Sequence, residues 1–279
     1  MVSSSDSPQA RSEVEGVHMT TVGILGAGYV GETLARRLAQ VGYTVKIANT
    51  RGPESLGRLD AVADVEPVWA TTVFENADIA ILAIPQTQSA NLGPEVSSAL
   101  GLVPTVIDTG NYGSDRDGNV ADILNGLPAT QWLADRLDRV LYKTLNNIEA
   151  HWMADGGRPV GDPDRIALPV SGPAGPGLET VKRLVDDLGF DPFHYGDIDE
   201  SWRQQMGTRT YCTNSSLTAL RTALAGATLD QTLEPNQVAY FVEGRLDHVA
   251  VMRNQAIKLK EKFGSSFGDP RINARRENP

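Results

Sequence analysis

The amino-acid sequence predicts an α/β fold with a doubly wound parallel sheet and a smaller C-terminal helical region. Short apolar segments, bounded by glycine, proline or polar residues, alternate with segments whose apolar residues recur at helical spacing. This alternation is typical of parallel strands joined by crossover helices. The segment at residues 77–84 is also apolar on both faces after Asp78, as expected of a central strand covered by helices on both sides.

The first strand, turn and helix contain the most informative motif. An apolar strand segment runs into Gly26-Ala27-Gly28-Tyr29-Val30-Gly31, and an apolar helical stripe follows. We expect Gly26 to make the tight turn, Gly28 to let the backbone approach a pyrophosphate, and Gly31 to let the helix pack closely on the strand. The start of the helix, with Tyr29 and Val30, would hold the anion. The motif therefore predicts a dinucleotide-binding (Rossmann) domain.

The end of the second strand, residues 44–48, indicates which dinucleotide binds. A site for NAD has an Asp or Glu about 20 residues after the glycines, which accepts hydrogen bonds from the ribose. Asn49 occupies that position here. Arg51 offers a planar cation suited to a 2′-phosphate, with the hydroxyls of Thr50 and Ser55 as neighbouring donors. We therefore expect NADP(H) as the cofactor.

The remaining elements follow in alternating order. Strands are expected at residues 66–70, 77–84, 104–108, 139–143, 165–170 and 191–195, and helices at residues 55–62, 87–100, 129–138 and 178–188. Polar segments follow three strands, at residues 85–87, 108–111 and 144–147. Ligands bind at the carboxyl ends of parallel strands, so these segments share an edge with the glycine turn. Each segment could equally be a simple turn.

The domain organisation is expected to have three parts. Residues 1–18 are polar and lack the apolar core of a secretory signal, so we expect a disordered tail. The NADP-binding domain should span residues 19–199, and residues 200–279 should form the C-terminal helical region.

Two helices are expected in this C-terminal region. Asn214 or Ser215 could cap one that ends near residue 225, and Pro235 could open a longer one that ends near residue 263. The apolar face of the longer helix could pack on the sheet domain, on a partner subunit, or on both. We expect a homo-oligomer, a dimer, through these helices.

Composition narrows the class of partner. The 279 residues carry a formal net charge of −10, which argues against nucleic acid or an anionic membrane as the main partner. No apolar run approaches the ~18 residues of a membrane-spanning helix. The single cysteine, Cys212, excludes an internal disulfide and suits a reducing cytoplasm. The histidines and Cys212 lack the spacing of metal ligands, so we expect no metal site. We expect the substrate to be a small molecule.

With these segments identified, the chain resembles the deazaflavin (coenzyme F420)-dependent NADP reductase family over about residues 19–212. The matching segments lie at residues 23–28, 48–56, 106–112, 143–148, 157–159 and 184–190. The resemblance implies hydride transfer between NADPH and a deazaflavin coenzyme bound across the sheet edge from the nicotinamide. It also implies that Thr50, Arg51 and Ser55 hold the 2′-phosphate and that Ile84-Pro85 lies near the nicotinamide ribose.

By the same resemblance, Asn111, Lys143 and Asn146 line the space for the second substrate, and they are the candidate catalytic residues. Asn111 is expected to contact the cofactor as well. Archaeal members that use deazaflavin have His-Thr-Ile where this chain reads Asn146-Asn147-Ile148. Alternative second substrates therefore stay open.

Three functions remain on the sequence alone. The leading one is an NADP(H)-dependent oxidoreductase that exchanges a hydride with a small organic acceptor such as the deazaflavin. The second is an NADPH-dependent ketone or imine reductase of a biosynthetic pathway, for which Lys143, Tyr112 or His151 could donate a proton. Lys143 could instead be structural and pair with Asp108. The third is a non-catalytic NADP(H) sensor.

Overall fold

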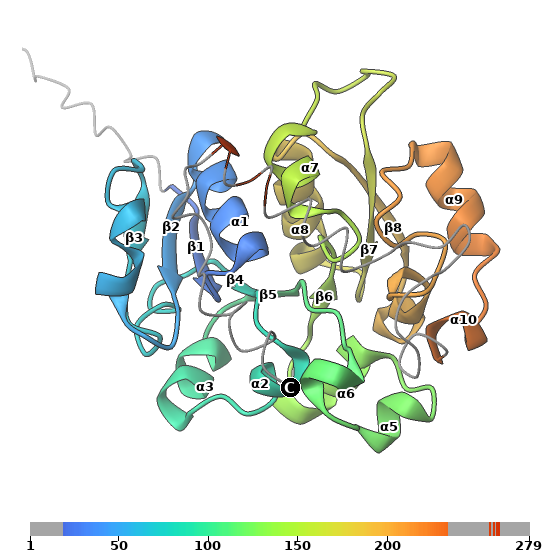
Figure 1. Ribbon diagram of the computed structural model, residues 1–279, viewed down its shortest axis with the longest axis horizontal. Helices are drawn as coiled ribbons and strands as arrows, with labels where there is room; N and C mark the ends of the chain where they lie inside the picture. The colour runs from blue at the N-terminus through green and yellow to red at the C-terminus, as the bar shows by residue number, and fades with distance from the viewer. Residues whose placement is uncertain (1–18, 234–256, 258, 260, 263–279) are drawn as a thin grey trace, which may run out of the picture.

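The computed structural model describes residues 19–233, 257, 259, 261 and 262 of the chain. These residues form one mixed sheet with helices on both faces (Figure 1), so the predicted α/β fold is confirmed. The strand order is β3-β2-β1-β4-β5-β6-β7-β8. The strands are β1 (Thr21–Leu25), β2 (Thr44–Ala48), β3 (Val65–Pro67), β4 (Ile79–Leu82), β5 (Thr105–Asp108), β6 (Tyr142–Lys143), β7 (Ala167–Ser171) and β8 (Asp191–Gly196).

The helices between these strands cover both faces of the sheet. The α-helices are α1 (Tyr29–Gln40), α2 (Gln86–Ser89), α3 (Pro94–Gly101), α4 (Ser114–Asp117), α5 (Ala121–Leu124), α6 (Ala129–Leu137), α7 (Ala150–Asp155), α8 (Pro176–Asp187), α9 (Leu217–Ala225) and α10 (Asp230–Leu233). Two 3₁₀-helices are described as well, η1 (Pro53–Leu59) and η2 (Ile198–Gln204). Of the described helices, none is long and apolar enough to cross a membrane.

One strand pair departs from the parallel arrangement. Neighbouring strands from β3 through β6 are parallel, whereas β6 and β7 are antiparallel, and β8 is parallel to β7. Lys143 pairs with Ser171 in this antiparallel pair. Lys143 and Ser171 are the last residues of β6 and β7. The carboxyl end of β7 therefore lies beside the carboxyl end of β6, at the same edge as the ends of the parallel strands.

Some expected elements differ in extent. The helix expected at residues 87–100 is two helices, α2 and α3, because Gly93-Pro94 interrupts it and Pro94 opens α3. The strand expected at residues 66–70 already ends at Pro67, and β6 keeps only two residues. Ser216, not Asn214 or Ser215, caps α9, since its side chain accepts a hydrogen bond from the Ala219 N–H.

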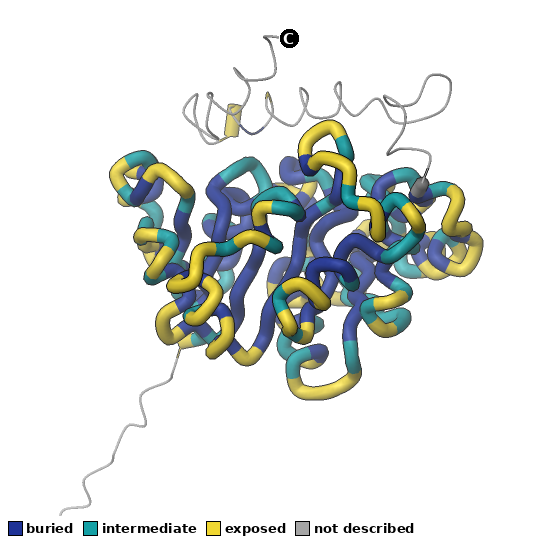
Figure 2. Tube along the Cα trace, turned by 90° about the horizontal axis from the view of Figure 1, so that it is seen from below, coloured by how far each residue is buried: buried dark blue, intermediate teal, exposed yellow. Residues whose placement is uncertain are grey.

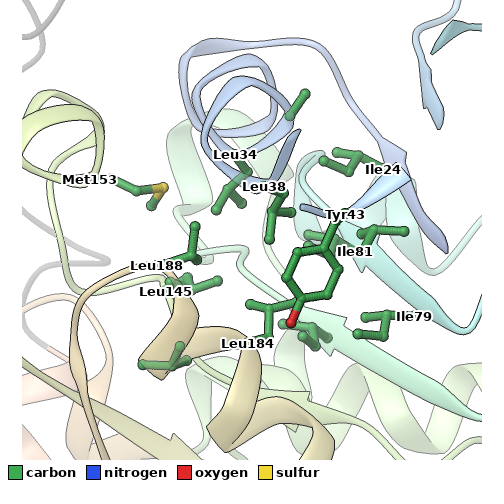
Figure 3. Close-up of a cluster of buried hydrophobic side chains, with 14 of the residues drawn as sticks. Ile24, Leu34, Leu38, Tyr43, Ile79, Ile81, Leu145, Met153, Leu184 and Leu188 are labelled. Carbon is green, nitrogen blue, oxygen red and sulfur yellow. The ribbon is translucent and has the colours of Figure 1, made fainter. Parts of the chain in front are cut away.

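The apolar core lies in two layers, one on each face of the sheet. Between the sheet and helices α1 and α8, Leu34 and Leu38 are fully buried and face Ile24 and Leu184 (Figure 3). The opposite layer packs α3 and α6 on the sheet. The strands form the buried centre of the molecule, and exposed loops surround them (Figure 2). The core thus holds the carboxyl ends of the parallel strands at one edge of the sheet.

Several expectations fall outside the described residues. The tail at residues 1–18 lies there entirely, as does most of the helix expected from Pro235. Within that helix, residues 257, 259, 261 and 262 are described and are helical.

Candidate functional site

The three glycines of the first turn have the geometry expected of each. Gly26 has φ +115°, and a Cβ there would lie 2.3 Å from the Ala83 carbonyl oxygen. A Cβ on Gly31 would lie 1.9 Å from the Gly26 carbonyl oxygen, so α1 can pack on β1 only without a side chain. Around Gly28, by contrast, a Cβ would meet no described atom within 4 Å. The backbone at Gly28 is therefore open on the side where a pyrophosphate would approach.

The N-terminus of α1 is electrostatically prepared for an anion. Gly28 is the N-cap residue, and no side chain among the described residues caps the helix there. Glu32 lies in the first turn and is fully buried, where its charge would oppose an anion. Its two carboxylate oxygens accept from Arg36 at 2.9 Å and Arg58 at 2.6 Å. Because both arginines compensate Glu32, the positive end of the helix dipole remains available to a phosphate.

The end of β2 forms a structured turn with an exposed cation. The Asn49 amide nitrogen donates to Ser55 Oγ at 2.8 Å, and the Arg51 N–H donates to Asn49 Oδ1 at 2.8 Å. Ser55 Oγ in turn donates to the Gly52 carbonyl at 2.7 Å. Thr50 and Arg51 are exposed. Asn49 thus organises the turn that presents Thr50 and Arg51 beside the glycine motif.

Ile84 and Pro85 follow β4 and lie next to the glycine turn. A Cβ on Gly26 would lie 2.8 Å from Ile84 Cγ2, so the Ile84 side chain borders the turn directly. Pro85 is the N-cap residue of α2. The structure therefore brings together the glycine turn, the end of β2 and Ile84-Pro85 at one sheet edge.

Two of the three residues expected around the second substrate, Asn111 and Asn146, are hydrogen-bonded to each other. The Asn111 amide nitrogen donates to the Asn146 carbonyl at 2.9 Å, and the Asn146 amide nitrogen donates to Asn111 Oδ1 at 3.0 Å. Asn146 is 4% exposed, whereas Asn111 is partly exposed. Asn111 is therefore the member of this pair that reaches the surface.

Gln204 of η2 completes this group, although sequence reasoning did not find it. Its amide nitrogen donates to Asn146 Oδ1 at 2.8 Å, and its Oε1 accepts from Ser171 Oγ at 2.9 Å. Gln204 is fully buried and lies beyond the expected domain boundary at residue 199. No local pattern in the sequence marks it, because its partners come from β7 and the segment after β6.

Lys143 lies in the interior beside Asp108. Its Nζ donates to Asp108 Oδ2 at 2.9 Å and also to the Gly110 carbonyl, and its side chain is 1% exposed. Thr130 and Gln86 donate to the same Asp108 oxygen. Burial lowers the pKa of Lys143, and the Asp108 carboxylate opposes that shift. The pairing with Asp108, one of the two alternatives for Lys143, is present.

The other candidate proton donors have different surroundings. The Tyr112 hydroxyl donates to the Gly118 carbonyl at 2.6 Å and accepts from the Val120 N–H, which fixes the loop after β5. His151 is 9% exposed, and its Nδ1 lies 3.6 Å from Glu149 Oε2. Among the residues the structure describes, no group of three or more His, Cys, Asp or Glu side chains is arranged to hold a metal ion.

Comparisons with known proteins also indicate a dinucleotide-binding fold. The model of the family described as NADP oxidoreductase, coenzyme F420-dependent, matches residues 21–112. Protein YjhV of Escherichia coli (strain K12) is 44% identical over 54 residues, which cover 19% of this chain and 39% of YjhV. The chain thus spans about two fifths of the length of this curated relative.

Two crystal structures share the fold over most of their length. A hypothetical protein from Sinorhizobium meliloti is 29% identical with a TM-score of 0.56, over 69% of this chain and 93% of that one. A proposed F420-dependent NADP-reductase from Arthrobacter sp. FB24 is 25% identical with a TM-score of 0.53, over 64% of this chain and 86% of that one. The match over residues 21–112 and the two structures support the suspected family, a family of NADP-dependent oxidoreductases.

Proposed function

We propose that this protein is an oxidoreductase that binds NADP(H) at the glycine turn and transfers a hydride between NADPH and a deazaflavin coenzyme. The observation that carries the proposal is the turn after β2. It has Asn49 where NAD-binding sites have a carboxylate, and it exposes Arg51 and Thr50 beside the N-terminus of α1. The family match over the same residues supports this cofactor.

Charge at the turn favours the phosphorylated ribose. An Asp or Glu in place of Asn49 would repel a 2′-phosphate, whereas the neutral amide does not. Arg51 can donate two parallel hydrogen bonds to phosphate oxygens. The nearest carboxylate in sequence, Glu54, is exposed to solvent, which screens its charge. The turn therefore supports NADP(H) over NAD(H).

The nicotinamide supplies the hydride when the cofactor is bound, and the chain supplies position and exclusion of water. Ile84-Pro85 would border the nicotinamide ribose, and Ile84 already lies against Gly26. Asn111 would offer polar contacts to the second substrate, held in place by Asn146 and Gln204. Such a buried hydrogen-bonded support restricts the side-chain rotamers and sharpens the geometry.

Two candidate proton donors, Lys143 and Tyr112, already donate hydrogen bonds to other groups of the protein, which favours deazaflavin as the acceptor. Lys143 Nζ is held by Asp108 and the Gly110 carbonyl, and the Tyr112 hydroxyl is held by Gly118. A ketone or imine needs a proton at the reacting heteroatom, whereas hydride transfer to a deazaflavin has no obligatory strong acid. The relative from Arthrobacter, named for this activity, supports the same acceptor.

The alternative is an NADPH-dependent ketone or imine reductase, and one observation favours it. His151 pairs with Glu149 at 3.6 Å, an arrangement that can hold the imidazole in one orientation for proton transfer. His151→Gln should abolish turnover of such a substrate and leave deazaflavin reduction unchanged. A non-catalytic sensor finds less support, because residues 21–112 match the model of a family of oxidoreductases.

The proposal extends to assembly and location. We propose a homodimer through the C-terminal helices, since the segment expected to be helical from Pro235 has a continuous apolar face. We propose a cytoplasmic location on the basis of the single cysteine.

A side-by-side assay of acceptors tests the proposed reaction. Purified full-length protein is supplied with NADPH and, in parallel, with the deazaflavin coenzyme, a small ketone and a cyclic imine. We expect NADPH oxidation with the deazaflavin and little with the other two. NADPH oxidation with the imine or ketone alone would replace the proposal by the alternative.

A further inference from the structure

The described part of the C-terminal segment packs on α7, in a cluster that also borders the start of α1. Leu259 is fully buried and forms an apolar cluster with Ala150 and Ala154 of α7. Tyr29 and Val30, the first two residues of α1, pack against this cluster. The described C-terminal residues, coloured red in Figure 1, accordingly lie between α1 and α7. A residue far along the chain thus belongs to the cluster against which the first residues of α1 pack.

A polar anchor accompanies this apolar contact. Lys262 Nζ donates to the Ala154 carbonyl at 3.0 Å and pairs with the Asp155 carboxylate, both at the end of α7. Leu259 and Lys262 are three residues apart in a helix and share one face. Ile257 is 55% exposed, and Glu261 is exposed too. The segment therefore presents one specific face to α7 and α1.

The contact matters because of what the first turn of α1 does. The N–H groups at a helix start bind an anion only when the turn holds them in a convergent arrangement. Gly28 provides no side chain to restrain this turn, and no side chain from the described part of the chain caps it. The cluster of Leu259, Ala150 and Ala154, against which Tyr29 and Val30 pack, provides a restraint from outside the turn.

We propose that the C-terminal segment, through Leu259, is a positioning element of the dinucleotide site. It holds the first turn of α1 in the conformation that binds NADP(H), and bound NADP(H) holds the segment in its docked position. The inference rests on the proposed function, because it takes NADP(H) as the ligand. The two effects are thermodynamically linked. If docking of the segment raises the affinity for NADP(H) by some factor, bound NADP(H) raises the docking equilibrium of the segment by the same factor.

The test compares three variants of the full-length chain. Leu259→Ala removes most of the buried side chain, and we expect NADPH to bind about tenfold more weakly, within the range of ordinary coupling between sites. Ile257→Ala makes a matched truncation at an exposed position of the same segment and should leave the dissociation constant unchanged. Leu259→Met keeps the apolar volume and should restore most of the affinity.

Limited proteolysis supplies a second readout, which a purely structural role of Leu259 would not affect. Because Lys262 Nζ is held by the Ala154 carbonyl and the Asp155 carboxylate, trypsin should cut after Lys262 more slowly while these contacts persist. Saturating NADPH should therefore slow this cleavage about tenfold in the wild type, and much less in Leu259→Ala. Unchanged cleavage with and without NADPH in the wild type would overturn the inference.

The outcomes separate this inference from the proposed function. A wild-type protein that binds no NADPH would refute both. NADPH binding with equal affinity in the wild type and Leu259→Ala would refute the inference alone. If Leu259→Ala does not fold, Asp155→Asn replaces it, because its carboxylate is 62% exposed and leaves no cavity. That variant should weaken NADPH binding about two- to fivefold, and no change would count against the inference.

Discussion

Replacement of Arg51 by alanine isolates the group that should distinguish NADPH from NADH. Arg51 is exposed at the end of β2, and its own N–H is held by Asn49 Oδ1 at 2.8 Å. Since the hydrogen bond to Asn49 uses the backbone of Arg51, we expect it to persist when the side chain is removed. Asn49 and Ser55 keep their mutual hydrogen bond in the variant. A change in affinity would report on the guanidinium and not on the fold.

The magnitude follows from the interaction that is lost. A hydrogen bond to a charged group contributes about 1.5–3 kcal/mol, and about 1.4 kcal/mol corresponds to a tenfold change in affinity. We therefore expect Arg51→Ala to weaken NADPH binding about ten- to hundredfold. NADH lacks the 2′-phosphate, so its affinity should change by less than about twofold. Because the site is exposed, the difference should shrink as salt is added.

The assay is titration calorimetry of NADPH and of NADH with the wild type and the variant. Arg51→Lys keeps the charge but lacks the planar fork, so it should fall between the two. Arg183→Ala removes an equal charge from an exposed position on α8 and serves as the control. An equal loss of affinity for both cofactors in Arg51→Ala would refute the assignment of the 2′-phosphate site.

Three further predictions concern the turn, the buried ion pair and the cysteine. Gly28→Ala should fold normally, because its Cβ would meet no described atom within 4 Å. It should bind NADPH at least about tenfold more weakly, because the added methyl group lies where the pyrophosphate would approach. Gly31→Ala should instead lower the melting temperature, because its Cβ would clash with the Gly26 carbonyl oxygen. Lys143→Met should cost about 3–5 kcal/mol in urea unfolding by leaving Asp108 buried and uncompensated, and the double variant with Asp108→Asn should recover part of that loss. A double variant no more stable than Lys143→Met would contradict the pairing. Burial raises the pKa of the Cys212 thiol from 9.0 to about 12, so alkylation at neutral pH should be at least about tenfold slower than for a free thiol and should accelerate as pH rises toward that value. Alkylation as fast as that of a free thiol would contradict this environment.

The parts of the site that local sequence determines were predictable. Gly26, Gly28 and Gly31 act through their own backbone conformation and close approach, so their spacing alone predicted the turn. The turn from Asn49 to Ser55 is also local, since its hydrogen bonds join residues at most six positions apart. The local geometry of these two turns could therefore be inferred from the order of the residues alone.

The hydrogen-bonded group around Asn111 and Asn146 depends on long-range pairing, which the periodicity of the sequence does not contain. Gln204 reaches Asn146 from η2, 58 positions away in the chain. Ser171 arrives beside Lys143 because β7 runs antiparallel to β6, whereas the alternation of strands and helices predicted a parallel sheet throughout. The break at Gly93-Pro94, by contrast, could have been predicted from the sequence, because proline interrupts a helix. The prediction of a single helix at residues 87–100 did not take it into account.

The fate of the hydride tests the central claim most directly. The full-length protein is given NADPH that carries deuterium at the transferable C4 position, together with the oxidised deazaflavin coenzyme, and the reduced coenzyme is examined by mass spectrometry and NMR. We predict that the deuterium appears on the reduced deazaflavin, with a slower transfer than for unlabelled NADPH. Tight binding of NADPH without any deuterium on the deazaflavin would contradict the account and assign the site to another acceptor.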